Sequence, residues 1–336
     1  MDGRTDKEDV RMLRVLFAGT PEVAVPSLRT LAKDTEHFEV VAVLTRPDAP
    51  TGRGRRLMAS PVKMAALELG LPVMECDPNE EVFLSALKAT GAEAAAIVAY
   101  GRILKEPVLE ALPMGWYNLH FSLLPQWRGA APVQRAIWAG ESVTGASVFR
   151  VTKGMDEGPV LAQSTVEIGA HENAGELLDR LAEDGAHLLA ASLEGMAEGQ
   201  ITPVEQPAGA FEVAAKISHD DAHMRFDVPV FALDRQIRAC TPLPGAWCDL
   251  HVQGDALAPT TLHVTKASPA SAELRESVEV PEGLKPGELH ITKHHVWVGT
   301  STEALELQLV KAQGKKEMGA AEWARGAHLG AGAFLD

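Results

Sequence analysis

The stretch Ala94-Ala95-Ala96-Ile97-Val98-Ala99-Tyr100 is apolar except for the hydroxyl of its final tyrosine, and it does not alternate between apolar and polar residues. Such a run is typical of a central strand in a parallel sheet, because helices cover both faces of that sheet. Other β-rich runs alternate with helix-like stretches between residues 14 and 168; they are Val15–Ala18, Val40–Leu44, Trp116–Phe121 and Ser147–Val151. This rhythm predicts an α/β domain with a mostly parallel, Rossmann-like sheet.

A long helix is predicted to follow, because Asn173 is a suitable N-cap and leucines recur at helical spacing as far as Gly195. The next residues, 202–210, are rich in proline and small residues and read as a linker. We therefore expect a first domain over residues 1–202, a linker over 203–216 and a second domain over 217–336.

The second domain is predicted to be a small β-barrel. It begins with an amphipathic stretch, Val228–Cys240, that is followed by turn residues. Short β-rich runs then recur at Ala246–Val252, Thr261–Ala267, His290–Val298 and Leu305–Val310.

Composition excludes several classes of protein. The chain has 336 residues, is 46% hydrophobic and carries a formal net charge of -15, which is unfavourable for non-specific binding to polyanions. Its three cysteines, Cys76, Cys240 and Cys248, have no Cys-x-x-Cys spacing and indicate a reducing compartment. Without an apolar leader or a membrane-length apolar run, the sequence predicts a cytoplasmic protein.

The first strand-to-helix turn, Gly19-Thr20-Pro21-Glu22, lacks both Gly-x-Gly-x-x-Gly and the Gly-Lys-Ser/Thr of a Walker motif. A nicotinamide or ATP site is therefore disfavoured. The turn is interpreted as a tight backbone connection, although a role in facing substrate stays open because ligands bind at the carboxyl ends of such strands.

Asn118 and His120 supply the first candidate chemistry. Alternate residues of a strand point to the same face, so an amide and an imidazole would lie side by side next to the loop that begins at Ser122. Asp156 follows in a turn flanked by Gly154 and Gly158. Each feature alone is more often structural. Together they can support acyl transfer to an amine without a serine or cysteine nucleophile.

The chain resembles the methionyl-tRNA formyltransferase family from Arg14 to Lys316. The resemblance is carried by Asn118-x-His120, by Ser122-Leu123-Leu124-Pro125 and by the distant Asp156. It implies transfer of a formyl group from 10-formyltetrahydrofolate to the α-amino group of initiator methionyl-tRNA. The implied catalytic residues are Asn118, His120 and Asp156. It also implies that residues 1–202 are the catalytic domain, that the second domain is OB-like and that the protein is a monomer. Nothing in the sequence requires a metal.

The resemblance further implies a folate site. The pterin is expected beside the end of the central strand and the Ser-Leu-Leu-Pro loop. The expected binding residues are Ile97, Tyr100, Gly101, Arg102, Ser122, Leu123, Leu124 and Pro125.

Positive charge is concentrated in the connection between Thr45 and Lys63, which has a local balance of +4 from five basic residues and Asp48. A basic loop can lie on phosphates or simply be solvated. The resemblance implies that it contacts the acceptor end of the tRNA and that the second domain holds the stem. The expected tRNA-binding residues are Arg53, Arg55, Arg56, Lys63, Arg238, Lys315 and Lys316.

Two alternatives stay open at this point. A formyltransferase acting on a sugar-nucleotide or other small amine would not need the basic loop or the barrel, and a non-catalytic RNA-binding protein would not need the polar triad. Residues 219–227 also depart from the family pattern. His290, His294 and His295 lie close in sequence, but their β-rich context without a matching carboxylate or cysteine makes zinc binding improbable.

Overall fold

The computed structural model describes residues 12–51, 56–252, 259–329 and 332–336. The chain divides into two compact units, one comprising residues 1–129, 144–166 and 178–213 and the other comprising 130–143, 167–177 and 214–336. The boundaries of 202 and 217 proposed from the sequence stay predictions.

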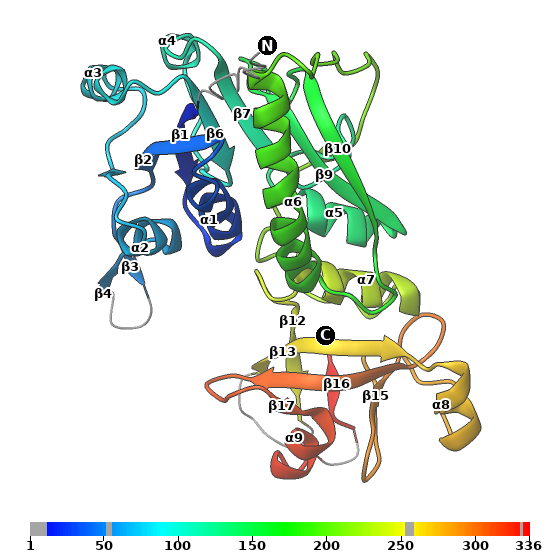
Figure 1. Ribbon diagram of the computed structural model, residues 1–336. Helices are drawn as coiled ribbons and strands as arrows, with labels where there is room; N and C mark the ends of the chain where they lie inside the picture. The colour runs from blue at the N-terminus through cyan, green and yellow to red at the C-terminus, as the bar shows by residue number, and fades with distance from the viewer. Residues whose placement is uncertain (1–11, 52–55, 253–258, 330–331) are drawn as a thin grey trace, which may run out of the picture. The chain divides into compact units, whose positions relative to one another are not determined.

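The first unit is built on a seven-stranded sheet with the order β10-β9-β7-β6-β1-β2-β5 (Figure 1). Its strands are β1 (Leu13–Gly19), β2 (Phe38–Leu44), β5 (Val73–Met74), β6 (Ala94–Val98), β7 (Gly115–His120), β9 (Val143–Arg150) and β10 (Val160–Glu167). The pairs β1–β2, β1–β6, β2–β5 and β6–β7 are parallel, whereas β7 and β9 are antiparallel. The predicted mostly parallel, Rossmann-like sheet is confirmed.

The central position predicted for residues 94–100 is also confirmed, because β6 lies between β7 and β1. The strand is two residues shorter than predicted. It ends at Val98 because Ala99 and Gly101 adopt left-handed backbone angles, with φ of 47° and 76°. These angles turn the chain away from the sheet at its carboxyl edge.

Helices connect these strands. They are η1 (Glu22–Ala24), α1 (Val25–Lys33), α2 (Pro61–Glu68), α3 (Glu81–Thr90) and α4 (Glu106–Leu109), and a small hairpin joins β3 (Ala49–Thr51) to β4 (Arg56–Met58). At the first strand-to-helix turn, a Cβ on Gly19 would lie 2.8 Å from Ala24 Cβ. Only glycine fits this tight connection, which supports its interpretation as a backbone turn.

The predicted long helix is α6 (Ala174–Ala197), which begins in the second unit and continues in the first. Its predicted N-cap is confirmed, since Asn173 Oδ1 accepts a hydrogen bond from the Glu176 N–H. The Glu176 carboxylate in turn accepts from the Asn173 N–H. This reciprocal capping box satisfies backbone donors that a helix start leaves unpaired.

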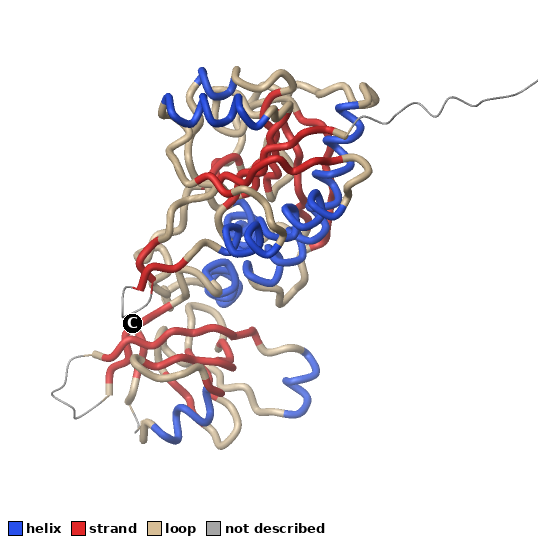
Figure 2. The backbone as a smooth tube through the Cα atoms, turned by 60° about the vertical axis from the view of Figure 1, so that its left-hand side comes forward, coloured by secondary structure: helices blue, strands red, loops and turns tan. Residues whose placement is uncertain are grey.

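The second unit contains a seven-stranded antiparallel sheet with the order β14-β15-β16-β13-β12-β18, and β17 also pairs with β16. Figure 2 draws the strands of both units in red. Its strands are β12 (Trp247–His251), β13 (Thr260–Pro269), β14 (Leu289–Ile291), β15 (Val296–Val298), β16 (Leu305–Ala312), β17 (Met318–Gly319) and β18 (Phe334–Leu335). A bridge between Glu288 and Phe334 links the two ends of the sheet. The predicted barrel is therefore confirmed as a nearly closed one, and residues 290–298 form a hairpin of two strands.

Helices complete the second unit; they are α5 (Pro132–Ala139), α7 (Val230–Cys240), α8 (Ala272–Ser277) and α9 (Ala320–Gly326). The amphipathic stretch predicted at 228–240 corresponds to α7, which packs on α5 and β13. Its buried residues Leu233 and Ile237 join the barrel core around Val264, Val298 and Leu307.

Apart from the two large sheets, two short strands, β8 (Arg128–Gly129) and β11 (Val213–Ala214), pair with each other.

Candidate active site

Strand β7 carries the first two predicted catalytic residues at its carboxyl end. Asn118 pairs with Ile97 of β6 on one side and with Phe149 of β9 on the other, whereas His120 pairs with Ser147. Because the two residues are two positions apart on the same strand, their side chains leave the same face of the sheet. The Asn118 side-chain amide is half-buried and makes no hydrogen bond within the described ranges. It is therefore available to a ligand.

The His120 imidazole is held in one orientation. It is 6% exposed, and its Nε2 lies 2.9 Å from the carbonyl oxygen of Trp127. A carbonyl only accepts, so Nε2 carries the hydrogen and Nδ1 presents a lone pair when the ring is neutral. Burial lowers the pKa of His120, and the opposing effects of Asp156 and the Trp127 carbonyl are smaller. The ring is thus a neutral base at pH 7.

Asp156 lies in the turn between β9 and β10, as the sequence predicted, and its carboxylate reaches His120. Its Oδ2 accepts a hydrogen bond of 2.9 Å from the Gly129 N–H and lies 3.7 Å from His120 Nδ1. Asp156 has a φ of 53°, a left-handed conformation uncommon for a residue with a side chain. Such strain persists only where the surroundings fix it, and it is concentrated at functional sites.

The predicted Ser122–Pro125 loop is fixed by a buried serine of the neighbouring strand. Ser147 Oγ donates to the Ser122 carbonyl at 2.6 Å and accepts from the Leu124 N–H at 3.0 Å. Gln163 Nε2 donates both to Ser147 Oγ and to the Leu124 carbonyl. Ser122 Oγ donates to the Gln126 carbonyl. These hydrogen bonds use most of the loop's polar groups and hold the loop in one conformation.

The other predicted folate-binding residues lie at the carboxyl end of β6, in the same unit as the loop. Tyr100 is buried, and burial raises its pKa to about 12. Arg102 forms an ion pair with Asp77, and Arg46 Nη2 donates to the Gly101 carbonyl at 2.8 Å. The backbone N–H groups of Gly101 and Arg102 make no hydrogen bond to any described residue. They are donors that a ligand can use.

Two of the predicted tRNA-binding residues, Arg53 and Arg55, lie outside the described residues. Arg56 is exposed on β4. Lys63 lies on α2, where its Nζ contacts Asp48 Oδ1 at 2.7 Å and Glu75 Oε2 at 2.9 Å. These hydrogen bonds, that of Asp48 first, raise the pKa of Lys63. Its charge is therefore already balanced by two carboxylates.

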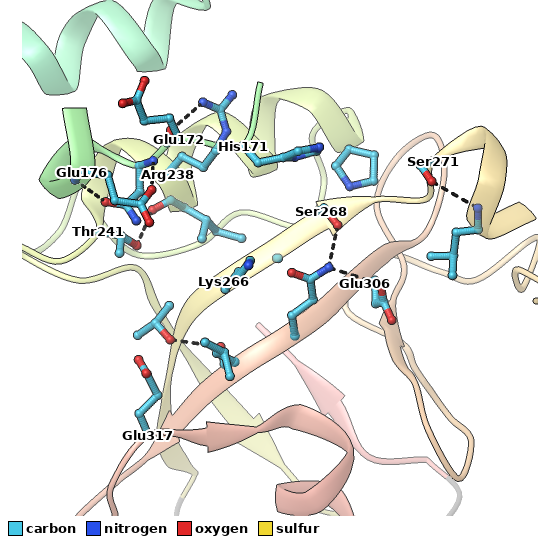
Figure 3. A pocket seen from close by; sticks show the side chains of 18 residues that line it. His171, Glu172, Glu176, Arg238, Thr241, Lys266, Ser268, Ser271, Glu306 and Glu317 are labelled. Atoms are coloured by element: carbon cyan, nitrogen blue, oxygen red, sulfur yellow. Dashed lines mark hydrogen bonds between the residues drawn. The ribbon is translucent and has the colours of Figure 1, made fainter. Parts of the chain in front are cut away.

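The remaining predicted tRNA-binding residues are in the second unit. Arg238 lines a pocket of about 870 Å³ to which Lys266 and the start of α6 also contribute (Figure 3). Its guanidinium donates to Asp234 Oδ2 at 2.9 Å and to the Glu172 carbonyl at 3.2 Å. Acidic side chains also line the pocket; they are Glu172, Glu176, Glu306 and Glu317. Lys315 and Lys316 are exposed in the turn after β16.

The sequence did not point to several groups that hold the site together. These are the Trp127 carbonyl, the Gly129 N–H and the side chains of Ser147, Gln163 and Gln206. The two backbone groups could not be predicted because any residue supplies them. Gln206 lies in the stretch predicted only as a linker, and no spacing or motif marks it.

Neither a metal centre nor a membrane span is found in the described part of the chain. Within it, no group of three or more His, Cys, Asp and Glu side chains is arranged to hold a metal ion. His295 contacts the Glu306 carboxylate through Nδ1 at 2.5 Å, so a carboxylate partner that the sequence did not reveal does exist. None of the described helices is both long and apolar enough to cross a bilayer.

Comparison with known proteins places this geometry in a family. Residues 12–193 match the formyl transferase family and residues 216–328 match its C-terminal domain. The methionyl-tRNA formyltransferase of Bifidobacterium animalis subsp. lactis is 77% identical over 97% of this chain and 100% of its own length. That of a Mycobacterium strain is 49% identical over 95% of this chain and 98% of its own length.

Solved structures of lower identity share the fold. An N-formyltransferase from Helicobacter canadensis, complexed with folinic acid and dTDP-3-aminofucose, has a TM-score of 0.59 at 16% identity and covers 88% of this chain and 99% of its own. HypX from Aquifex aeolicus with tetrahydrofolic acid has a TM-score of 0.61 at 17% identity over 94% of this chain and 47% of its own. On the two domain matches and the identity to these full-length relatives, the chain belongs to the methionyl-tRNA formyltransferase family.

Proposed function

We propose that this chain transfers the formyl group of 10-formyltetrahydrofolate to the α-amino group of initiator methionyl-tRNA, giving the formylated tRNA with which translation begins. The observation that carries the proposal is the buried His120 imidazole. Its Nδ1 faces Asp156 across 3.7 Å, next to the unpartnered amide of Asn118. The proposal is also supported by similar proteins, which are named methionyl-tRNA formyltransferases.

Asn118 is assigned to the formyl oxygen. When the amine attacks the formyl carbon, negative charge builds up on that oxygen, and a preorganised donor stabilises it most where water is excluded. The amide of Asn118 is such a donor because it is half-buried and has no partner among the described residues.

His120 and Asp156 are assigned to proton transfer. An α-amino group has a reference pKa of about 7.7–8.0, so a useful fraction is the free nucleophile at neutral pH. As the new C–N bond forms, Nδ1 of His120 takes the proton that the nitrogen must lose. The proton is returned to the nitrogen of the donor as the old C–N bond breaks. Asp156 stabilises the imidazolium while it lasts. No covalent bond to the protein is needed.

The folate is assigned to the carboxyl end of β6. The unpaired N–H groups of Gly101 and Arg102 can donate to acceptors on the edge of a pterin. Ile97 and the fixed loop formed by Ser122, Leu123, Leu124 and Pro125 would supply the surrounding walls, and Tyr100 is buried in the turn after β6. The residues present fit a flat ring with one polar edge.

The tRNA is assigned to basic residues of the two units. Arg56 is an exposed residue of the basic loop on β4, and Arg53 and Arg55 are proposed with it from the sequence. Lys63, Arg238, Lys315 and Lys316 are proposed as further phosphate contacts. Phosphate contacts make binding depend steeply on salt.

The proposal is tested by incubating the purified chain with 10-formyltetrahydrofolate and either methionyl-tRNA or a panel of small amines, including an amino-sugar nucleotide. We expect deformylation of the folate with methionyl-tRNA, and a loss of about a hundredfold in Asn118→Ala. Turnover with the amino-sugar nucleotide but not with the tRNA would overturn the proposed acceptor. Normal turnover of Asn118→Ala would remove that residue from the mechanism.

A further inference from the structure

The Gln206 side chain makes four hydrogen bonds to segments of the active site. Its Nε2 donates to the carbonyl oxygens of Asp156 and Gly158, each at 2.8 Å. Its Oε1 accepts from Arg128 Nε at 3.0 Å and from Arg128 Nη2 at 2.7 Å. One side chain from the stretch predicted as a linker thus ties the Asp156 turn to the loop that follows His120.

The amide nitrogen of Gln206 contacts the backbone of the Asp156 turn, and its amide oxygen contacts the loop that binds the Asp156 carboxylate. The donor half holds the main chain of the turn at Asp156 and Gly158, where Asp156 has its left-handed φ of 53°. The acceptor half holds Arg128, and the next residue, Gly129, donates its N–H to Asp156 Oδ2 at 2.9 Å. Gln206 therefore holds the backbone of Asp156 directly and its carboxylate through Arg128 and Gly129.

The Arg128 guanidinium contacts three different side chains. Besides Gln206, its guanidinium lies 3.6 Å from Glu157 Oε1 and 6.0 Å from the centre of the Phe211 ring. An arginine held by an amide, a carboxylate and an aromatic ring has a defined position rather than a flexible one. Gln206 and Phe211 both come from the segment predicted as a linker, so that segment supplies two of the three contacts.

We propose that Gln206 is a positioning residue for formyl transfer, holding the strained Asp156 turn so that its carboxylate stays within reach of His120. The proposal rests on the function proposed above for His120 and Asp156. It adds that their separation is set by an amide about 50 residues further along the chain, and not by the turn's own sequence.

The test compares Gln206→Ala, Gln206→Met and Gln206→Glu with Gln200→Ala. Gln200 is an exposed glutamine six residues before Gln206, and its amide contacts only Glu198 among the described residues. Methionine preserves the volume without hydrogen bonds. Glutamate keeps the acceptor for Arg128 but loses the N–H donors to the two carbonyls.

We expect kcat for formyl transfer to fall about a hundredfold in all three Gln206 variants, with each KM within about twofold, because misplacing a reacting group by about 1 Å has that effect. Gln200→Ala should match the wild type. A normal kcat in Gln206→Glu would overturn the proposal, since the contact with Arg128 would then suffice. An increase in KM with kcat unchanged would also overturn it.

A second readout needs no turnover. The imidazole resonances of His120 are followed by NMR against pH in the wild type and in each folded Gln206 variant. Asp156 opposes the lowering of the His120 pKa, so its displacement should move the titration to lower pH. An unchanged titration would overturn the positioning role. A wild type that titrates as expected but transfers no formyl group would instead overturn the proposed function.

Discussion

Nδ1 of His120 and Oδ2 of Asp156 face each other at 3.7 Å, which is beyond hydrogen-bond distance. The other nitrogen of the ring is committed to the Trp127 carbonyl, and Oδ2 is committed to the Gly129 N–H. Nδ1 of the neutral ring is therefore the nitrogen that can accept a proton. Once Nδ1 is protonated, the imidazolium and the carboxylate form an ion pair in a partly buried site, where charges interact strongly.

Asp156→Asn tests that ion pair. Asparagine tolerates left-handed backbone angles and can still accept from Gly129, so the turn should keep its shape. Without the negative charge the imidazolium loses its stabilisation, and we expect kcat to fall about a hundredfold or more. Single-turnover formylation of methionyl-tRNA measures the effect. A variant within twofold of the wild type would contradict the assignment of Asp156.

The pH profile tests the neutral state of His120. Burial places its pKa below the ordinary 6.5, so the neutral base persists as the pH falls to 6.5 and is lost only at lower pH. Above that point only the α-amino group, with a pKa of about 8, should limit the rate. We expect log kcat/KM for methionyl-tRNA to fall with unit slope from about pH 7.5 to 6.5 and more steeply below. Steepening above pH 6.5 would contradict a depressed pKa.

Ser147→Ala tests whether the Ser122–Pro125 loop is held by its buried partner. The change leaves the Ser122 carbonyl and the Leu124 N–H without the serine hydroxyl, which is fully buried. We expect the free energy of unfolding to fall by about 3 kcal/mol, together with an increase in KM for the folate. Chemical denaturation and steady-state kinetics measure the two effects.

The matched control is Ser192→Ala. Ser192 is also buried, but its hydroxyl donates only to the Leu188 carbonyl within α6 among the described residues. Its loss should lower the free energy of unfolding by about 1 kcal/mol or less and leave KM unchanged. Equal effects of the two serine variants would refute the special role of Ser147.

Arg56→Ala and Lys63→Ala compare an exposed cation with a paired one. Arg56 is exposed, whereas the Lys63 ammonium contacts Asp48 and Glu75. A phosphate contact by Arg56 should add about one unit to the salt slope of tRNA binding, and its loss should remove that unit. Lys63→Ala should change the slope less. Filter binding at several salt concentrations measures both, and a larger effect of Lys63→Ala would contradict this order.

The strands and long helix could be predicted because their signals are local. An apolar run without alternation suffices to place residues 94–98 in the middle of a sheet, and Asn173 suffices as an N-cap for α6. The end of β6 could not be predicted, because nothing in Ala99 itself indicates a positive φ. The hairpin at 289–298 could not be resolved into its two strands from the sequence because each strand is only three residues long.

The sequence by itself determined the chemical groups: an amide and an imidazole two residues apart on one strand, and a carboxylate in a glycine-flanked turn. The tertiary structure alone decided their protonation and spacing. The tautomer of His120 depends on a carbonyl seven residues away, and the Asp156 turn is fixed by Gln206 from another part of the chain. Hydrogen bonds of this kind use backbone groups and long sequence separations, so no local pattern encodes them.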